Sequence, residues 1–431
     1  MQTPAEAATL NVPSSQYPTI QSAINAANRG DTIIVEAGRT YTENLVLRYK
    51  SAGTGYVTIQ SSALSSLPAA GNRVSPSDAA NMPTIRSTAA GATSAISTVS
   101  GSTPSHHYKL IGLQILRHNS TSQQTQVISI GTSGSSQDSI DEMPHDIIID
   151  RCLIRGADNA ATRRGIRLDG KDVQVINSYI DNFWEGGADS QAIAAINGGQ
   201  NVLIANNFLE GASENILTGG GDPSITNFNP NNWTIEHNHF FKRLSWVGAG
   251  KQVKNILEFK MADTFIIRNN IFENCWADAQ DGRGIHFSLR NQDGSAPWAT
   301  VSNMTFEYNI VKNVGNGISF LVEDDSQTSV PQDNITVRNN LVLIDGDDNG
   351  GLGWALLFSG GQADGSNHTI DHNTFIQAPG GNRFIESSGQ DFITDLVITN
   401  NIVAGDSGDI GRIAAGGNAG SAALIFIVDG D

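Results

Sequence analysis

Residues 204–209 read IANNFL, and residues 235–240 and 267–272 repeat the same arrangement as IEHNHF and IRNNIF. In each segment apolar and polar positions alternate, a polar pair follows, and an apolar residue closes the unit. The other members of the series are IDRCLI at 149–154, VINSYI at 175–180, FEYNIV at 306–311, VRNNLV at 337–342, IDHNTF at 370–375 and ITNNIV at 398–403. The second residues of the polar pairs form one column, spaced 26 to 39 residues apart: Cys152, Ser178, Asn207, Asn238, Asn270, Asn309, Asn340, Asn373 and Asn401.

A period of this length indicates a repeat architecture in which each unit stacks on its neighbours. Alternation with a period of two indicates strands, and coils of about 30 residues with three short strands stack about 4.8 Å apart. Stacked asparagines can satisfy the buried amides of the turns between coils. The sequence therefore predicts an all-β fold, a single-stranded right-handed parallel β-helix (solenoid) with an Asn ladder, as one domain over residues 1–431.

The N-terminal segment 17–38 differs from the repeats. Its spacing of Ile20, Ile24 and Ala27 predicts an amphipathic helix over about residues 17–30, ended by Gly30 and followed by a strand at 32–36. An open end of a solenoid exposes unpaired strand edges, so we expect this helix to be an N-terminal cap.

Composition limits the partners. The net charge of −17 disfavours binding to nucleic acid, and no stretch approaches the 18 apolar residues of a membrane span. The two cysteines, Cys152 and Cys275, belong to no metal-binding motif and are expected to be buried free thiols. We expect a bacterial protein that is secreted, extracellular or attached to the cell surface; the sequence leaves its oligomeric state open.

A second series of strands precedes the polar pairs, for example KNILEFK at 254–260, GIHFSLR at 284–290 and GISFLVE at 317–323. Alternation assigns these residues to the interior: Leu257, Phe259, Ile285, Phe287, Leu289, Ile318, Phe320 and Val322. It assigns these residues to the outer face: Arg167, Asp169, Thr218, Glu258, Lys260, His286, Ser288, Arg290 and Glu323. Stacking would bring the outer residues into one polar strip.

Long loops flank this strip and are expected to form the walls of a groove. On one side they cover 219–231, 291–303 and 324–333, and on the other side 241–254, 274–284 and 344–353. Four tryptophans fall in or beside such loops: Trp184, Trp246, Trp276 and Trp298. Indole faces stack well on sugar rings, although the same residues could instead anchor the loops to the coils. The sequence thus favours a polysaccharide partner, with Arg167, Asp169, Trp246, Trp276, Trp298 and Glu323 as candidate binding residues.

The whole chain resembles the pectate-lyase-like β-helix superfamily. Residues 145–320 also resemble a group of secreted bacterial β-helix repeat proteins of unassigned activity, through segments such as DSQAIAAINGG at 189–199 and KNILEFKMA at 254–262. A narrower similarity is to the alginate lyase and chondroitinase B family, in which a Lys on such a strand is the base and an Arg one coil later is its partner. Lys260 and Arg290 stand correspondingly. That family binds calcium through two acidic residues before the Lys, where this chain has Val253 and Asn255.

Three functions follow as alternatives. A lyase cleaving an acidic polysaccharide by β-elimination would use Lys260 as base, Arg290 as carboxylate clamp and His286 as acid or proton shuttle, with Glu258 beside them. A glycoside hydrolase would pair carboxylates from Asp169, Glu258 and Glu323, with Glu258 and Glu323 two coils apart. A non-catalytic glycan-binding protein of the cell surface would use the same face without turnover.

No cofactor is indicated with certainty. Calcium stays open, because loop residues Asp222, Asp278, Asp281 and Asp293 offer oxygen ligands.

Overall fold

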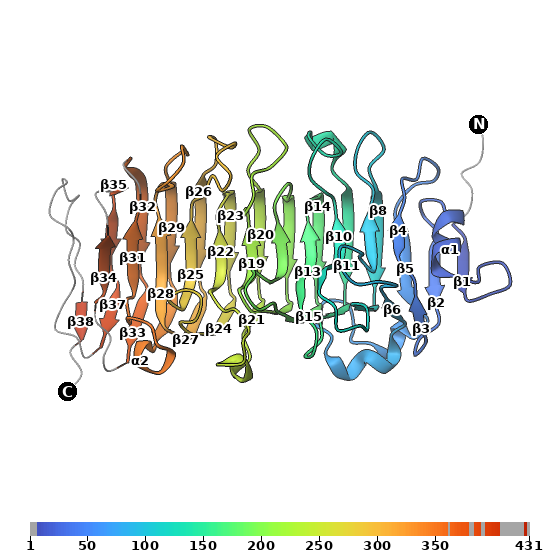
Figure 1. The fold of residues 1–431 in the computed structure, drawn as a ribbon, viewed down its shortest axis with the longest axis horizontal. Coiled ribbons are helices and arrows are strands. Elements are labelled where there is room, and N and C mark those ends of the chain that lie inside the picture. The colour runs from blue at the N-terminus through green and yellow to red at the C-terminus, as the bar shows by residue number, and fades with distance from the viewer. Residues whose placement is uncertain (1–6, 361–362, 379–382, 389–392, 406–425, 429–431) are drawn as a thin grey trace.

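The computed structural model describes residues 7–360, 363–378, 383–388, 393–405 and 426–428. Within these residues the chain winds through successive coils, and most coils contribute one strand to each of three parallel sheets (Figure 1). All strand pairs run parallel and join each coil to the next. This is the right-handed parallel β-helix that the repeats predicted.

Sheet 1 includes the strands that end at the nine polar pairs and has 14 strands among the described residues. They are β1 (Thr9–Val12), β2 (Thr32–Val35), β5 (Val57–Ser61), β8 (His106–Ile111), β11 (His145–Asp150), β14 (Lys171–Ile176), β17 (Gln200–Ala205), β20 (Asn231–Glu236), β23 (Ala262–Arg268), β26 (Val301–Glu307), β29 (Asp333–Arg338), β32 (Gly365–Asp371), β35 (Ile393–Thr394) and β36 (Val397–Thr399).

Sheet 2 includes the strands that follow the polar pairs and has 13 described strands. They are β3 (Thr40–Thr42), β6 (Thr84–Arg86), β9 (Gln114–Leu116), β12 (Leu153–Arg155), β15 (Tyr179–Phe183), β18 (Phe208–Gly211), β21 (His239–Phe241), β24 (Ile271–Cys275), β27 (Ile310–Val314), β30 (Leu341–Ile344), β33 (Thr374–Gln377), β37 (Ile402–Ala404) and β38 (Phe426–Val428).

Sheet 3 carries the candidate polar strip and has 11 described strands. They are β4 (Leu45–Leu47), β7 (Ile96–Thr98), β10 (Gln124–Ile130), β13 (Thr162–Leu168), β16 (Gln191–Ala195), β19 (Glu214–Thr218), β22 (Asn255–Phe259), β25 (Arg283–Ser288), β28 (Asn316–Leu321), β31 (Leu356–Ser359) and β34 (Ile385–Ser388). The short helices are α1 (Ile20–Ala26), α2 (Gly346–Asn349) and the 3-10 turns Leu64–Ser66, Pro76–Asn81, Ile140–Glu142 and Leu244–Trp246.

The column of polar-pair residues explains the turn from sheet 1 to sheet 2. In the case of Asn270, the side-chain oxygen accepts from the backbone N–H of Asn238 at 2.9 Å, and the side-chain NH₂ donates to the carbonyl of Ile235 at 2.9 Å. The same bonds recur at Asn207, Asn238, Asn309, Asn340 and Asn373, all of which are buried. The side chains therefore pair turn amides that water cannot reach.

The first residue of each polar pair has a left-handed backbone. The φ angle is 55° at Asn206 and 56° at Asn269, and His237 and Tyr308 share this conformation. Asparagine tolerates the left-handed region better than most residues, and this tolerance explains its frequency at the first position of the pair.

The core runs through the middle of the coils. Every residue that alternation assigned to the interior of sheet 3 is at most 2% exposed. Its phenylalanines stack from coil to coil, with ring centroids 5.3 Å apart for Phe287 and Phe320 and 4.9 Å for Phe320 and Phe358.

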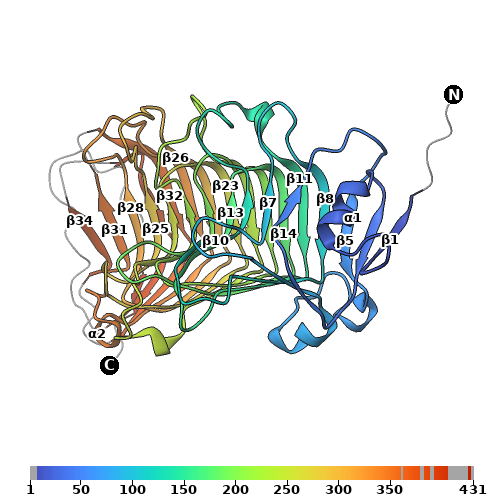
Figure 2. The same ribbon diagram turned by 45° about the vertical axis from the view of Figure 1, so that its right-hand side comes forward.

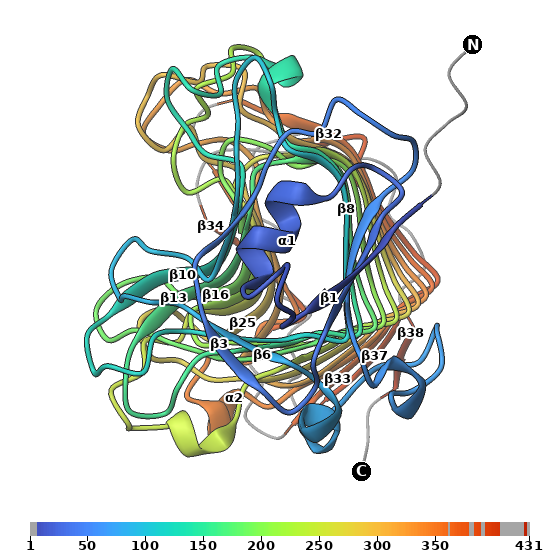
Figure 3. The ribbon, with the colours of Figure 1, turned by 90° about the vertical axis from the view of Figure 1, so that its right-hand side faces the viewer.

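Helix α1 lies across the N-terminal opening of the solenoid. The view along the axis of the solenoid shows the helix inside the outline of the coils (Figure 3). Ile20, Ala23 and Ile24 are fully buried, and Thr19 caps the helix by accepting from the N–H of Ser22. The expected cap is confirmed, although the helix spans only Ile20–Ala26. Within the described residues, no helix combines the length and apolar character that crossing a bilayer requires.

Candidate functional site

Lys260 and Arg290 lie on neighbouring coils, directly after β22 and β25 of sheet 3. The backbone N–H of Arg290 donates to the carbonyl of Lys260 at 2.9 Å, so the two residues are adjacent across the sheet. Glu258 and His286 pair in register on the same two strands. The structure therefore brings together the four residues for which the sequence predicted catalysis: Lys260, Arg290, His286 and Glu258. Strands β22 and β25 pair with each other in sheet 3, and Figure 2 shows β25 beside β28 and β31, the next strands of that sheet.

A cleft of about 390 Å³ opens beside these residues. Its lining consists of Arg283, His286, Arg290, Leu321, Asp325, Ser359 and Gly360, from β25, β28, β31 and the loops that follow them. Lys260 lies one coil before Arg290, and its ammonium donates to Gln292 Oε1 at 3.1 Å. The guanidinium groups of Arg283 and Arg290 both line the cleft, which makes it polar.

Arg290 is held by two carboxylates. Its guanidinium pairs with Asp324 at 3.1 Å and also with Asp325. Burial would lower the pKa of Arg290, but the hydrogen bond and charge of Asp325 outweigh it and raise the pKa overall. A carboxylate of a substrate would have to share Arg290 with these aspartates. By contrast, Arg283 pairs with Asp281, whose side chain is 54% exposed, and such a surface pair holds its partners weakly.

His286 is a buried neutral imidazole. Its Nε2 lies 3.1 Å from Nη1 of Arg283, which can only donate, so Nε2 accepts and the proton resides on Nδ1, 2.8 Å from Ser319 Oγ. Burial, with a smaller contribution from the Arg283 charge, lowers the pKa of His286 to about 3. His286 therefore has no imidazolium at neutral pH with which to act as the expected acid, because the ring stays neutral there.

Glu258 is 2% exposed and cannot touch a polymer on the surface. Its carboxylate accepts from the side-chain NH₂ of Asn255 at 2.9 Å. Burial would raise the pKa of Glu258, but the charge of Lys260 and the bond from Asn255 lower it overall, so Glu258 is ionised. We therefore assign Glu258 a positioning role beside Lys260.

Glu214, on β19, is a second buried carboxyl group that the sequence analysis did not single out. Its Oε2 accepts from Gln191 Nε2 at 2.7 Å, whereas its Oε1 has no hydrogen-bond partner. Burial and the charges of Glu258 and Asp189 raise the pKa of Glu214 to about 8. Gln191 and Glu214 are register partners that begin successive strands, so alignment of the repeats could have revealed the polar column.

The loops on one side of sheet 3 cover this carboxyl cluster instead of leaving a trench. Gln252 Nε2 and Lys254 Nζ hold Asp189 at 2.9 and 2.5 Å, and Gln280 Oε1 accepts from Asn255 at 2.9 Å. These residues lie in or beside the long loops 241–254 and 274–284. The chain length of the loops was evident from sequence, but their path over the sheet was not.

The two positions that match the calcium-binding residues of the alginate lyase and chondroitinase B family carry no acidic side chain here, as the sequence indicated. Val253 has no side-chain oxygen, and the amide of Asn255 is buried between Glu258 and Gln280. The two positions therefore lack the pair of carboxylates that the resemblance would require.

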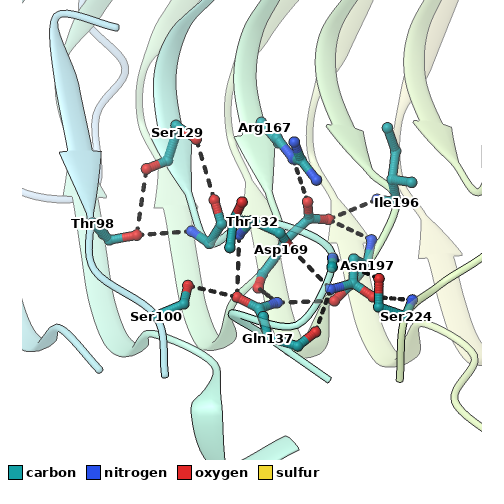
Figure 4. A network of polar contacts seen from close by, with 12 residues as sticks. Thr98, Ser100, Ser129, Thr132, Gln137, Arg167, Asp169, Ile196, Asn197 and Ser224 are labelled. Atoms are coloured by element: carbon teal, nitrogen blue, oxygen red, sulfur yellow. Dashed lines mark hydrogen bonds and ion pairs between the residues drawn. The ribbon is translucent and has the colours of Figure 1, made fainter. Parts of the chain in front are cut away.

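Asp169 is fully buried and holds a turn, although the sequence placed it on the binding surface. Its Oδ1 accepts from the N–H groups of Ile196 and Asn197 at 2.7 Å each, and its Oδ2 pairs with Arg167 (Figure 4). Gln137 and Asn197 extend the network to neighbouring coils. Asp169 and Arg167 thus fasten the connection from sheet 3 to sheet 1.

The tryptophans also lie differently from expectation. Trp246 and Trp276 are 4% and 6% exposed and belong to the hydrophobic core, so neither offers an indole face to a sugar ring. Trp298 is partly buried and donates from Nε1 to the carbonyl of Phe228 at 3.1 Å. All three tryptophans anchor loops, because removing the apolar surface of an indole from water stabilises the folded chain.

Glu323 follows β28 and accepts from the N–H of Ala363 at 2.7 Å. The residue two coils from Glu258 in register is Ser319, four positions before Glu323. Glu323 therefore lies four positions beyond the column of Glu258, and the two carboxylates that were expected two coils apart do not stack in register.

Comparison with known proteins finds no match by sequence and several solved structures of low similarity. No protein-family model and no curated protein sequence matches the chain. Among solved structures, the Dettilon tailspike protein is 15% identical, with a TM-score of 0.49, over 97% of this chain and 68% of that one. The α-1,3-glucanase of family GH87 from Streptomyces thermodiastaticus is 11% identical, with a TM-score of 0.49, over 95% and 69% of the chains.

A mannuronic acid-specific lyase of polysaccharide family 6 from human gut microbiota is 13% identical, with a TM-score of 0.46, over 92% of this chain and 86% of that one. At these identities and TM-scores the similarities assign no function to this chain. Membership of the pectate-lyase-like superfamily stays a prediction.

Glu214 should leave a signature in the pH dependence of stability. Its raised pKa means that, between the ordinary carboxyl pKa and about pH 8, the native chain binds a proton that the unfolded chain has released. The free energy of unfolding contributed by Glu214 is therefore full below this window and falls as the pH rises through it. We expect Glu214→Gln to remove this fall, as measured by urea unfolding between pH 5 and pH 8.

Glu36→Gln provides the control, because Glu36 pairs with Arg39 on the exposed surface. The difference between wild type and Glu214→Gln isolates Glu214 from histidines that titrate in the same range. If the free energy of unfolding had the same pH dependence in wild type and in Glu214→Gln, Glu214 would be ionised in the native state.

Proposed function

We propose that this protein acts on an acidic polysaccharide at the outer face of sheet 3 and cleaves it by β-elimination. The observation that supports the proposal is the adjacency of Lys260 and Arg290 next to a cleft that Arg283 and Arg290 line. Guanidinium groups bind carboxylates well, and an amine on the next coil can reach the sugar beside the bound carboxylate.

β-Elimination has three requirements that these residues can divide. A cation neutralises the uronate carboxylate, a base removes the proton on the adjacent carbon, and an acid protonates the leaving oxygen. We assign the first role to Arg283 together with Arg290, since the pair of Arg283 with exposed Asp281 is easily exchanged. Lys260 in its uncharged form removes the proton, and the resulting ammonium returns it to the leaving oxygen.

The neighbouring residues act on Lys260 without touching substrate. Gln292 accepts a hydrogen bond from Lys260 and so restricts where the amine lies, whereas the negative charge of buried Glu258 opposes the loss of the proton that a basic Lys260 requires. The neutral ring of His286 orients Arg283 through Nε2. Cleavage of an extracellular polymer requires the enzyme outside the cell, which agrees with the expectation of secretion.

Glycoside hydrolysis is the second candidate, and one observation favours it. Glu214 and Glu258 have pKa values that their surroundings displace in opposite directions, to about 8 for Glu214 and below the ordinary value for Glu258. A protonated and an ionised carboxyl group are the acid and base of a hydrolase. Both side chains are covered, with 0% and 2% exposure, so hydrolysis would require the loops 241–254 and 274–284 to move away.

The test incubates the purified chain with alginate, pectate, chondroitin sulfate and a neutral glucan. We expect ultraviolet absorbance from unsaturated chain ends with at least one acidic polymer and none with the glucan. New reducing ends without that absorbance would establish hydrolysis and overturn the lyase assignment. Saturable binding of a polymer with neither signal would show a non-catalytic glycan-binding protein.

A further inference from the structure

Three of the nine histidines of the chain gather at the start of two neighbouring strands of sheet 1. His106 and His107 begin β8, and His145 begins β11, where it pairs in register with His106. The rings of His106 and His145 stack with centroids 5.1 Å apart. Asp146 follows His145, and the cluster lies on a different sheet from the cleft.

The side-chain atoms of this cluster converge on one another. His145 Nδ1 lies 2.7 Å and His107 Nδ1 lies 3.5 Å from the same oxygen, Oδ2 of Asp146. Ligand atoms of His107, His145 and Asp146 all lie within 4.8 Å of one another. The three side chains are 23%, 26% and 32% exposed, so an ion from solvent can reach them.

The two contacts of His107 compete for a single hydrogen. Nδ1 of His107 lies 2.9 Å from Nδ1 of His106 as well as 3.5 Å from the Asp146 carboxylate. A ring nitrogen carries at most one hydrogen, so His107 either divides it between two acceptors or faces the carboxylate with a lone pair. A cation at this point would attract the lone pairs that otherwise repel each other.

The backbone of the coils explains why the ligand atoms meet. His107 and Asp146 have left-handed φ angles of 58° and 55°, as do Asp172, Asn201 and Asn232 in the following coils. In those later coils, side-chain amides pair with the oxygens below them, at 2.9 Å from Asn201 to Asp172 and 2.7 Å from Asn232 to Asn201. At His107 and Asp146 the same ladder position carries an imidazole and a carboxylate, which are metal-ligand types.

We propose that His107, His145 and Asp146 bind a divalent transition-metal ion such as Zn²⁺, with water completing its coordination. Two imidazole nitrogens and one carboxylate oxygen suit Zn²⁺, Co²⁺ or Ni²⁺, whereas Ca²⁺ and Mg²⁺ prefer sets of oxygens. Ligand atoms about 2.0–2.1 Å from a tetrahedral ion stand about 3.4 Å apart. The distance of 3.5 Å between His107 and Asp146 meets this requirement. The contact of 2.7 Å between His145 and Asp146 would have to lengthen by less than about 1 Å to admit the ion.

Nearby cations weaken the site but do not block it. Lys171 is the register partner of His145 in the next coil, and its ammonium lies 4.0 Å from Asp141. Lys109 places its ammonium over the ring of Tyr56, 4.6 Å from the centroid. Because ligands come from β8 and β11, the bound ion would link two coils and stabilise the native chain by mass action.

The test uses the full chain without a histidine tag, freed of metal by a chelator and dialysed. We expect calorimetric titration with Zn²⁺ to show one ion per chain, Co²⁺ to develop visible absorption, and Ca²⁺ to give no comparable heat. His145→Ala and Asp146→Asn should each weaken binding at least about 100-fold, since each removes a ligand and losing even a supporting residue costs 10- to 100-fold.

His372→Ala is the matched control, because Nδ1 of His372 contacts Asp371 at 2.7 Å in the same way without a second histidine. It should leave the affinity unchanged. Circular dichroism and the thermal midpoint without metal report whether the variants are folded. Absence of stoichiometric binding by the wild type, or equal affinity in His145→Ala, would overturn the proposal. If a variant does not fold, a wild-type thermal midpoint that Zn²⁺ fails to raise would also overturn it.

Discussion

Lys260→Arg is expected to reduce β-elimination by roughly 100- to 10,000-fold, the contribution that a positioned acid–base group typically makes. Arginine keeps the positive charge beside buried Glu258 but does not release a proton at working pH. The substitution therefore separates proton transfer from the electrostatic support of Glu258. Initial rates of absorbance at saturating polymer, together with the urea unfolding midpoint, measure the two effects.

Two further variants make this result specific. Lys260→Ala should also abolish turnover, but it should lower stability as well, because Glu258 loses a compensating charge. Lys312→Arg is the matched control: Lys312 Nζ pairs with Glu273 at 3.1 Å on sheet 2, away from the cleft. Full activity of Lys260→Arg would exclude Lys260 as the base.

Asn270→Ala is expected to lower the stability of the solenoid by about 2–5 kcal/mol. The change leaves the N–H of Asn238 and the carbonyl of Ile235 buried and unpaired, and each such group costs about 1–3 kcal/mol. It also removes the contact of Asn270 with Asn309 in the next coil. The urea midpoint followed by circular dichroism measures the loss.

The neighbouring residue provides the control for this experiment. Asn269 is exposed and has a φ of 56°, which glycine adopts freely, so Asn269→Gly should change stability by less than about 0.5 kcal/mol. Equal losses for the two variants would mean that the polar pair acts through backbone conformation and not through the buried side-chain bonds.

The architecture of this protein was predictable because it follows from short-range patterns repeated many times. The alternation in KNILEFK and GIHFSLR placed Phe259 and Phe287 in the core, and the polar pairs placed Asn270 in the buried column. Stacking of equal coils then brought Lys260 beside Arg290, although 30 positions separate them. Residues at equivalent positions of a solenoid must be neighbours, so a correct register carries over to distant pairs.

The chemical state of the site was not predictable in the same way. Alternation correctly directs Glu258 and His286 away from the core, but neighbouring side chains pack against both, so their exposed fractions fall to 2% and 6%. The resulting loss of solvent lowers the pKa of His286 to about 3, and the pairing of Arg290 with Asp324 and Asp325 arises from a loop one coil further on.

Thus the strands, the column of buried asparagines and the adjacency of Lys260 and Arg290 follow from the order of residues, because one repeated pattern governs them. The cap follows from the helical spacing of Ile20, Ile24 and Ala27. Burial of Glu214, anchoring of Trp246 and Trp276, and the role of Asp169 depend on the folded chain. Each of these is decided by the path of a loop that does not repeat, and side-chain charge and exposure depend on whatever that loop places within a few ångströms.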